Sequence, residues 1–352
     1  MPTSPGQLLV YGAYGYTARL LLPKLREQGV EFVVAGRDRA RTEAIAREFD
    51  VPGRVFSLDR PAEIDRGLRG ASTVLNAAGP FMYTTAPIIR ACLRERVDYL
   101  DLSGEVEPLS QVADAGPAAR EAGLMFLPAI GFDVVPSDCL AAHVAKRVPN
   151  ARRLTFYVSA SNLMSHGSGV TLAEHIGIPV HTRRDGRLEQ MRMRMQMRWA
   201  DFGSGYRPVV AVSWGDLVTA YRSTGIPNIE VYFEATAFRL AAVTINQYWG
   251  WMLRATAANE WFHRYADMLP EGPTREERAA ERCTVVVEAE GPDGVARSRI
   301  ETPEAYECTA DTATRVIHRV MEGERQPGFQ TPSTLFGPDF VLDCEDVTRV
   351  DL

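Results

Sequence analysis

The sequence lacks a hydrophobic run that could cross a bilayer. The strongest candidate is the uncharged, aromatic-rich stretch at residues 240–253, whose 14 residues fall short of the roughly 20 that a membrane span needs. Asn246 and Gln247 also interrupt it. We expect no membrane span and interpret the stretch as a buried or interface helix, with peripheral lipid contact as the alternative.

A large excess of either charge is also missing. The chain has 39 Lys and Arg residues against 45 Asp and Glu residues, which gives a net charge of −6. A composition without a basic excess gives no general reason to bind nucleic acid or an anionic membrane surface. We therefore expect a small-molecule partner.

Signatures of metal sites, disulfides and hydrolases are missing as well. The five cysteines are odd in number and never in CxxC spacing, and the six histidines show no HExxH pattern. No GxSxG nucleophile motif occurs, and the N-terminal MPTSPGQ does not resemble a signal peptide. These absences predict no metal, no disulfide framework, no hydrolase chemistry and a reducing, cytoplasmic location.

The length and the apolar content are ample. With 352 residues, 45% of them hydrophobic, the chain can bury the cores of roughly two domains. Apolar strand-like segments alternate with helical ones over the first 150 residues, which predicts a parallel sheet covered on both faces. Pro23 is expected to kink or end the first helix. The expected strands are residues 8–11, 32–36, 54–59, 72–79, 98–105 and 124–133.

A glycine-rich turn joins the first strand to the first helix. The sequence GAYGYTA places Gly12, Gly15 and Ala18 at the spacing of a shortened GxGxxG fingerprint. Gly12 permits a sharp turn, Gly15 permits close approach of a phosphate, and Ala18 permits tight helix packing. A helix start also favours an anion, so the turn predicts a dinucleotide site, with an ordinary tight connection as the alternative.

The end of the second strand carries an arginine. Arg37 lies there and is followed by Asp38, Arg39 and Arg41. An acid at this place binds the ribose 2′-hydroxyl of NAD, whereas an arginine accommodates the 2′-phosphate of NADP. The pattern predicts NADP(H) as the cofactor. The alternatives are that the arginines only begin a solvated helix, and that Asp38, which is also suited to cap that helix, reads the ribose.

These segments together resemble a known family. The series GAYGYTARLL, VVAGRDRARTEAIA, NAAGPF, VDYLDLSGE and PAIGFDVVPSD is similar to saccharopine dehydrogenase-like oxidoreductases, which include trans-acting enoyl reductases. The resemblance continues at GSGVT and GFQTPSTLFGPDF. It implies a doubly wound, Rossmann-type α/β nucleotide domain with an inserted α+β substrate domain built on an antiparallel sheet. It does not specify the substrate.

The resemblance also implies a cofactor site at the carboxyl ends of the strands. Asp59 is placed to bind the adenine, and the turn at residues 77–80 passes over the nicotinamide side. Well-capped structural turns at these ends are the alternative. The implied cofactor residues are Gly12, Tyr14, Gly15, Tyr16, Thr17, Gly36, Arg37, Asp59, Ala77, Ala78, Gly79, Pro80, Ser103 and Phe132.

Candidate catalytic groups are proton donors near these ends, because in hydride-transfer enzymes the protein must polarise the acceptor and supply a proton. The catalytic candidates are Tyr83, Asp133 and His175. The candidates for substrate binding are Glu105, His166 and Thr171. The glycine turn GSGVT runs into a helix start, which suits a carboxylate or carbonyl. A purely structural histidine is the alternative at both histidine positions.

Beyond residue 150 the pattern changes. Segments 152–160, 209–214, 229–238 and 283–291 predict strands of an antiparallel sheet. The stretch MRMRMQMR at residues 191–198 places four methionines on one face. They line either an adaptable apolar pocket or, in our preferred interpretation, a core or homodimer interface with the arginines in water.

The chain is expected to return to the first domain at its end. Thr302 and Pro303 match a helix N-cap with proline at the first helical position, before an apolar stripe that ends at Gly323. The family resemblance implies that this helix and the tail pack back on the nucleotide domain, so we expect a nucleotide domain of residues 1–150, completed by residues 302–352. A substrate and dimerisation domain would occupy residues 151–301.

Two functions of different classes fit the sequence. One is an NADPH-dependent oxidoreductase that reduces a conjugated C=C or C=N bond of a small or lipid-like biosynthetic metabolite. The other is a non-catalytic NADP-binding sensor or scaffold. We favour the enzyme because the strand-end motifs beyond the phosphate turn are intact.

Overall fold

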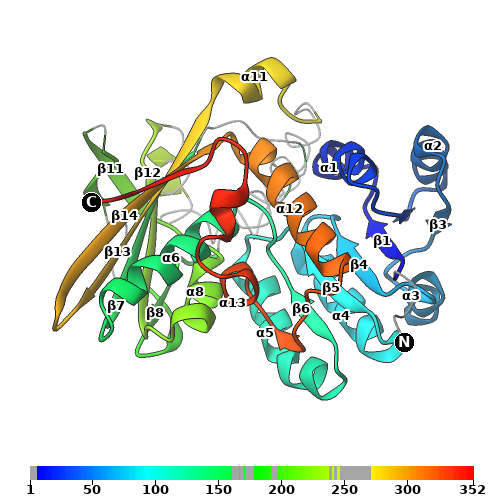
Figure 1. Cartoon of the computed structure of the whole chain (residues 1–352), viewed down its shortest axis with the longest axis horizontal. Coiled ribbons are helices and arrows are strands. Elements are labelled where there is room, and N and C mark those ends of the chain that lie inside the picture. Colours follow the sequence, from blue (N-terminus) through cyan, green and yellow to red (C-terminus); the bar gives the residue numbers. More distant parts are fainter. Residues whose placement is uncertain are drawn as a thin grey trace. The chain divides into compact units, whose positions relative to one another are not determined.

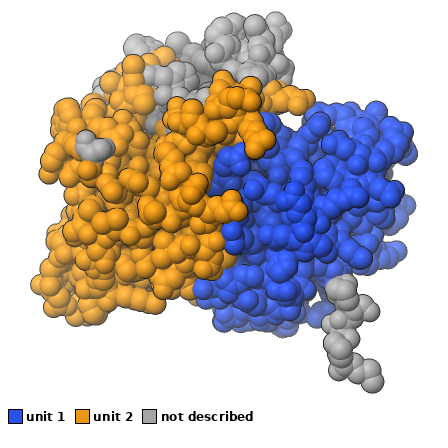
Figure 2. Space-filling model, turned by 45° about the horizontal axis from the view of Figure 1, so that its top comes forward, with its two compact units in different colours: residues 1–135, 306–336 blue, residues 136–305, 337–352 orange. Residues whose placement is uncertain are grey.

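The chain divides into two compact units, shown in different colours in Figure 2. Unit 1 comprises residues 1–135 and 306–336, and unit 2 comprises residues 136–305 and 337–352. The structure is a computed structural model. It describes residues 6–160, 166, 170, 178–191, 197–203, 205–237, 240–241, 244–245 and 271–352.

Unit 1 contains a seven-stranded sheet, in which every strand pairing is parallel (Figure 1). The order is β15-β6-β5-β4-β1-β2-β3, which confirms the predicted doubly wound α/β fold. Its order reverses between β1 and β4, and open α/β sheets bind ligands at such a switch point. The strands are β1 (Leu8–Tyr11), β2 (Phe32–Gly36), β3 (Gly53–Val55), β4 (Thr73–Asn76), β5 (Asp98–Asp101), β6 (Met125–Leu127) and β15 (Gly328–Phe329).

Helices flank this sheet, and the five innermost strands from β6 to β2 are buried along their whole length, as expected when both faces are covered. The prediction that Pro23 ends the helix early is wrong, because α1 continues through it to Glu27. Pro23 is exposed, and burial of three leucines on the opposite face outweighs its lost hydrogen bond. The helices are α1 (Tyr16–Glu27), α2 (Arg39–Phe49), α3 (Pro61–Leu68), α4 (Phe81–Glu95) and α5 (Val106–Glu121).

The chain returns to unit 1 through α12 (Ala305–Met321), β15 and α13 (Pro332–Phe336). The predicted helix start at Thr302 is wrong, because Thr302 and Pro303 end strand β14 (Gly294–Pro303). Strand β14 pairs with β13 as far as Pro303 opposite Arg282, so the sheet pairing overrides the local capping signal.

Unit 2 contains a nine-stranded sheet, and of its described pairings only β7 with β12 is parallel. The other described pairings are antiparallel and confirm the expected architecture. The strands of this sheet are β7 (Arg153–Ser159), β8 (His181–Arg184), β9 (Arg187–Gln190), β10 (Met197–Asp201), β11 (Tyr206–Ala211), β12 (Asn228–Glu234), β13 (Arg282–Gly291), β14 and β16 (Thr348–Asp351). The helices are α6 (Val135–Arg147), α8 (Asp216–Thr224) and α11 (Arg275–Ala280).

The last residues of the chain differ from the expected division. Residues 337–352 belong to unit 2, where β16 pairs with β14 at the sheet edge. The Asp351 carboxylate accepts hydrogen bonds from Ser298 Oγ at 2.6 Å and pairs with His143 and Arg147, both at 2.9 Å. This polar cluster holds the tail to the second sheet instead of the nucleotide unit.

The methionine–arginine stretch is described only at its ends. Met197 is 46% exposed, whereas Arg198 pairs with Glu230 at 2.9 Å and stacks over the Tyr232 ring. The predicted orientation, with methionine inside and arginine in water, is therefore wrong at this pair. Residues 192–196 lie outside the described residues.

Within the described part of the chain, no helix is both long and apolar enough to cross a membrane. The same residues contain no His, Cys, Asp or Glu group arranged to hold a metal. Most of the aromatic-rich stretch at 240–253 falls outside the description.

An ion pair between the exposed Arg325 and the buried Asp98 helps to hold the return segment to β5. Asp98, 5% exposed, accepts two hydrogen bonds from Arg325, at 2.8 and 2.7 Å, and a third from the Met125 amide. Arg325→Ala should lower the free energy of unfolding by about 2 kcal/mol, because it leaves a buried carboxylate without its cation. Denaturant unfolding measures the change. Arg39→Ala, which removes only an exposed pair with Glu43, should cost no more than about 0.5 kcal/mol.

Candidate functional site

The glycine turn after β1 has the geometry that the dinucleotide interpretation requires. Gly12 has a φ of +83°, which favours glycine, and its amide donates to the Ala35 carbonyl of β2 at 2.9 Å. A Cβ at Gly12 would lie 2.8 Å from Ala78, in the turn after β4. The turns after β1 and β4 therefore touch, and no larger residue fits at position 12.

Gly15 lies at the N-cap of α1, beside the first amides of the helix. A Cβ there would be 3.2 Å from the Gly12 carbonyl and 3.7 Å from the Ala77 carbonyl. The unsubstituted α-carbon thus keeps the space between the two turns open at a helix start, where an anion is stabilised. Next to it, the Tyr16 ring meets the Tyr306 ring of α12 edge-on at 5.1 Å.

Four polar residues at and just after the end of β2 have distinct roles. The Asp38 side chain accepts a hydrogen bond from the Arg41 amide at 2.9 Å and so caps α2, as predicted. Arg39 pairs with Glu43 at 3.1 Å. Arg37 is exposed and makes no hydrogen bond or ion pair with the described residues. Arg37 is therefore the available guanidinium, and Asp38 is engaged in capping.

The Tyr14 ring packs beside the end of β2 and the start of α2. The Arg41 guanidinium lies over the Tyr14 ring, 4.5 Å from its centroid. A Cβ at Gly36 would be 2.4 Å from the same ring, so only glycine at the end of β2 admits Tyr14. Asp59, predicted to bind the adenine, is exposed and accepts a hydrogen bond from Ser57 Oγ at 2.6 Å.

The turn after β4 is held by Asn76, which sequence reasoning missed. Asn76 is fully buried, and its side-chain oxygen accepts a hydrogen bond from the Ala78 amide at 3.2 Å. Its nitrogen donates to Thr84 Oγ1 at 3.0 Å, and Thr84 in turn donates to the Ala78 carbonyl at 2.7 Å. Residues 77–80, including a cis Gly79–Pro80 bond, are thus fixed from inside the sheet.

Asp101, also missed, fixes the ends of β5 and β6. One carboxylate oxygen accepts hydrogen bonds from the Ser103 amide, the Ser103 hydroxyl and the Ala129 amide, at 3.0, 3.0 and 2.7 Å. The other oxygen accepts from the Tyr99 hydroxyl at 2.7 Å. Burial raises the Asp101 pKa, and these hydrogen bonds oppose that rise. A signal was present: Asp98-Tyr99-Leu100-Asp101 puts two acids into a strand of an apolar sheet.

Two predicted acids meet beyond these strand ends. Burial, followed by repulsion from Glu105, raises the Asp133 pKa to about 7. Asp133 packs against Gly104, where a Cβ would lie 2.4 Å from its carboxylate oxygen. Glycine at 104 therefore makes room for the Asp133 carboxyl beside Glu105. Such a carboxyl exchanges a proton near neutral pH.

The other predicted residues of unit 1 vary in exposure. Tyr83, in the first turn of α4, is 56% exposed. Ser103 is fully buried with its hydroxyl engaged by Asp101. Phe132 is 5% exposed, and its amide donates to Thr309 Oγ1 of α12 at 3.0 Å. Thr17 lies in the first turn of α1.

Three predicted site residues lie beyond residue 150: the catalytic candidate His175 and the substrate-binding candidates His166 and Thr171. Thr171 and His175 lie outside the described residues. The His166 amide donates to the Glu271 carbonyl at 3.4 Å, and the role of its imidazole stays a prediction.

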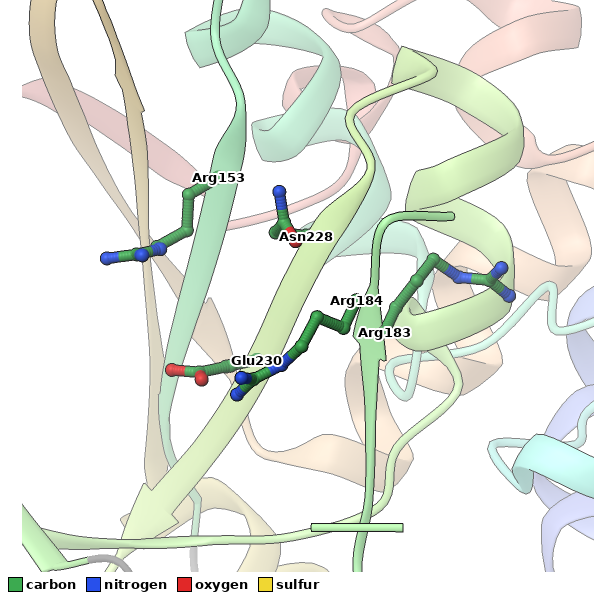
Figure 3. A pocket seen from close by; sticks show the side chains of 5 residues that line it. All are labelled: Arg153, Arg183, Arg184, Asn228 and Glu230. Atoms are coloured by element: carbon green, nitrogen blue, oxygen red, sulfur yellow. The ribbon is translucent and has the colours of Figure 1, made fainter. Parts of the chain in front are cut away.

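A polar pocket of about 220 Å³ lies on unit 2, lined by Arg153, Arg183, Arg184, Asn228 and Glu230. Arg184 extends toward Glu230, whereas Arg183 points away (Figure 3). Arg183 donates to the Leu217 and Gly186 carbonyls, and Arg153 pairs with Glu290. The cationic groups do not converge, so this pocket is a weak candidate for binding an anion.

Comparison with known proteins agrees with the site in unit 1. Residues 8–127 match the family model of the saccharopine dehydrogenase NADP binding domain. The resemblance inferred from the motifs is confirmed, and NADP(H) is the cofactor that this domain type binds.

Two curated relatives each match about two fifths of the chain. A trans-acting enoyl reductase of Mycobacterium ulcerans is 28% identical over 149 residues, which are 40% of this chain and 36% of that protein. A human saccharopine dehydrogenase-like oxidoreductase is 27% identical over 154 residues, 38% of this chain and 36% of that protein. The match thus spans just over a third of each relative.

The fold extends over the whole chain in one solved structure. The apo histidine-tagged saccharopine dehydrogenase (L-Glu forming) from Saccharomyces cerevisiae superposes with a TM-score of 0.63 at 12% identity. The superposition covers 99% of this chain and 100% of that one. This likeness shows a shared fold.

Gly15→Val tests the phosphate turn. Because its Cβ would start 3.2 Å from the Gly12 carbonyl, the added branches must enter the space between the turns. We expect NADPH binding to weaken at least about tenfold, or 1.4 kcal/mol, with little change in the unfolding temperature. Fluorescence titration with NADPH measures this. Affinity equal to that of the parent protein would mean that the turn does not contact the cofactor.

Arg37→Asp tests the choice of cofactor. A free guanidinium at this place should hold a 2′-phosphate by charge-assisted hydrogen bonds, so the parent should bind NADPH at least about tenfold more tightly than NADH. The variant should prefer NADH, because its carboxylate repels the phosphate and accepts from the ribose hydroxyls. Arg39→Asp makes the same charge change two residues away and should keep the NADPH preference. Loss of the NADPH preference in both variants would indicate that the net charge of this segment, and not a direct contact with Arg37, determines the preference.

Proposed function

We propose that the protein is an NADPH-dependent oxidoreductase that reduces an activated double bond, a conjugated C=C or a C=N, of a small or lipid-like biosynthetic metabolite. The observation that carries this proposal is Asp133. It is a proton-exchanging carboxyl near the same strand ends that carry the dinucleotide turns. A protein that only binds NADP has no need of such a group.

Bound NADPH supplies a hydride, and the remaining requirement is a proton for the other atom of the double bond. The Asp133 carboxyl, protonated below pH 7, donates this proton and becomes a carboxylate. Glu105 raises the pKa of Asp133 by repulsion and so keeps the proton available near neutral pH. Solvent then returns the proton, since Asp133 is only partly buried.

Conjugated C=C reduction is supported by the mycobacterial relative, whose name is trans-acting enoyl reductase. A C=N acceptor remains the second class, because a carboxyl protonates a basic imine nitrogen even more readily than carbon. Glu105, His166 and Thr171 remain our candidates for substrate binding. Tyr83 and His175 remain candidate proton donors.

The decisive experiment supplies candidate acceptors to the purified protein with NADPH. An α,β-unsaturated thioester, a cyclic enone and a cyclic imine represent the proposed classes, and loss of NADPH absorbance with a matching product mass reports turnover. If NADPH binds tightly but none of these acceptors is reduced, the second candidate, a non-catalytic NADP-binding protein, is favoured.

The Asp133 pKa gives a test that needs no substrate. Its pKa is raised from 3.8 to about 7, so folding favours the protonated form. The contribution of Asp133 to stability is therefore complete below pH 4 and declines as the pH rises to about 7. Asp133→Asn removes this decline, so the stability of the variant relative to the parent should increase between pH 4 and 8. Turnover by the parent should fall above pH 7. If the difference in free energy of unfolding between the parent and Asp133→Asn is the same at all pH values, the pKa of Asp133 is not raised.

A further inference from the structure

A chain of buried polar groups crosses the interior of unit 1 and joins the ends of β4, β5 and β6. Its central member is the Tyr99 hydroxyl, which accepts a hydrogen bond from Asn76 Nδ2 at 3.3 Å and donates to Asp101 Oδ2 at 2.7 Å. Asn76, Tyr99 and Asp101 are each 0% exposed. Water therefore cannot replace any of these bonds at low cost.

Each end of the chain reaches a different strand-end turn. At one end, Asn76 holds the Ala78 amide, and Thr84 closes a loop from Asn76 to the Ala78 carbonyl. At the other end, Asp101 holds Ser103 and the amide of Ala129. Ala129 has a φ of +58°, an unfavourable conformation for alanine, which this hydrogen bond helps to fix.

Stability alone does not account for the choice of these residues. Apolar side chains of similar volume at three buried positions would avoid the cost of desolvating an amide, a phenol and a carboxylate. What apolar packing cannot do is hold named backbone amides of two turns at fixed positions. Tyr99 is the only described group that bonds to both Asn76 and Asp101.

We propose that Tyr99 is a positioning residue, which keeps the turn at residues 77–80 in register with the turns after β5 and β6. This inference rests on the proposed function, in which residues 77–80 face the nicotinamide half of NADPH and Asp133 follows β6. Tyr99 acts through Asn76 and Asp101 and touches neither cofactor nor substrate. Its hydroxyl therefore affects one half of the cofactor site and leaves the adenosine half, at Arg37 and Asp59, unchanged.

The test compares two ligands on Tyr99→Phe. The substitution removes only the hydroxyl and keeps the ring contact with Phe126, whose centroid lies 5.8 Å away. We expect the Kd for NADPH to rise about tenfold, whereas the Kd for adenosine 2′,5′-bisphosphate, which lacks the nicotinamide half, should change less than about twofold. Isothermal titration calorimetry measures both.

Three further variants guard against a purely structural effect. Tyr232→Phe is a matched control in unit 2, since Tyr232 is also fully buried and donates to a carboxylate two residues away, that of Glu230. It should alter neither Kd. Thr84→Val breaks the same chain at its partly buried end and should reproduce the Tyr99→Phe pattern, and Thr84→Ser should restore parent values.

The outcomes separate this inference from the proposed function. Equal weakening of both ligands, or no weakening of NADPH, in Tyr99→Phe and Thr84→Val would overturn the role of Tyr99. Failure of the parent itself to bind NADPH would instead overturn the proposed function, whatever the variants do.

Discussion

The hydrogen bonds to the Asp101 carboxylate are the constraint on which the candidate site depends. Parallel strands bring their carboxyl ends to one edge of the sheet, but they do not determine the path of the chain after each strand. In unit 1 the buried Asp101 carboxylate hydrogen-bonds to the backbone after both β5 and β6. The Tyr99 hydroxyl connects this carboxylate to Asn76 at the end of β4. The glycines at 12 and 104 then allow neighbouring turns and side chains to approach these fixed ends. The site is therefore organised from the core outward.

Cofactor choice rests on competition for partners within one short segment. Residues 37–41 contain three arginines and an aspartate, and the sequence alone permits several assignments. Helix capping engages Asp38, the pair with Glu43 engages Arg39, and the Tyr14 ring engages Arg41. Only Arg37 is left without a partner among the described residues. Local helix energetics thus determine which charge is available to a ligand.

The parallel sheet, the glycine turn and the cap at Asp38 could be predicted, because each depends on residues close together in sequence. The two acids in strand β5 mark Asp101 as unusual, but the roles of Asn76 and Asp101 could not be predicted, since they depend on partners on or beyond other strands. The helix start at Thr302 and the position of the tail were mispredicted for a related reason. Strand pairing with β13 and β14, formed across long sequence separations, outweighs a capping signal or a domain boundary drawn along the chain.

The division of the chain also constrains how the protein can be made. Unit 1 receives α12 and β15 only after residues 136–305 of unit 2 have been synthesised, and unit 2 receives β16 only after residues 306–336 of unit 1. During translation the β6 edge of unit 1 stays unpaired until β15 has been made. An unpaired strand edge can pair with strands of other chains. A fragment ending near residue 150 would retain the phosphate turn but carry this edge permanently.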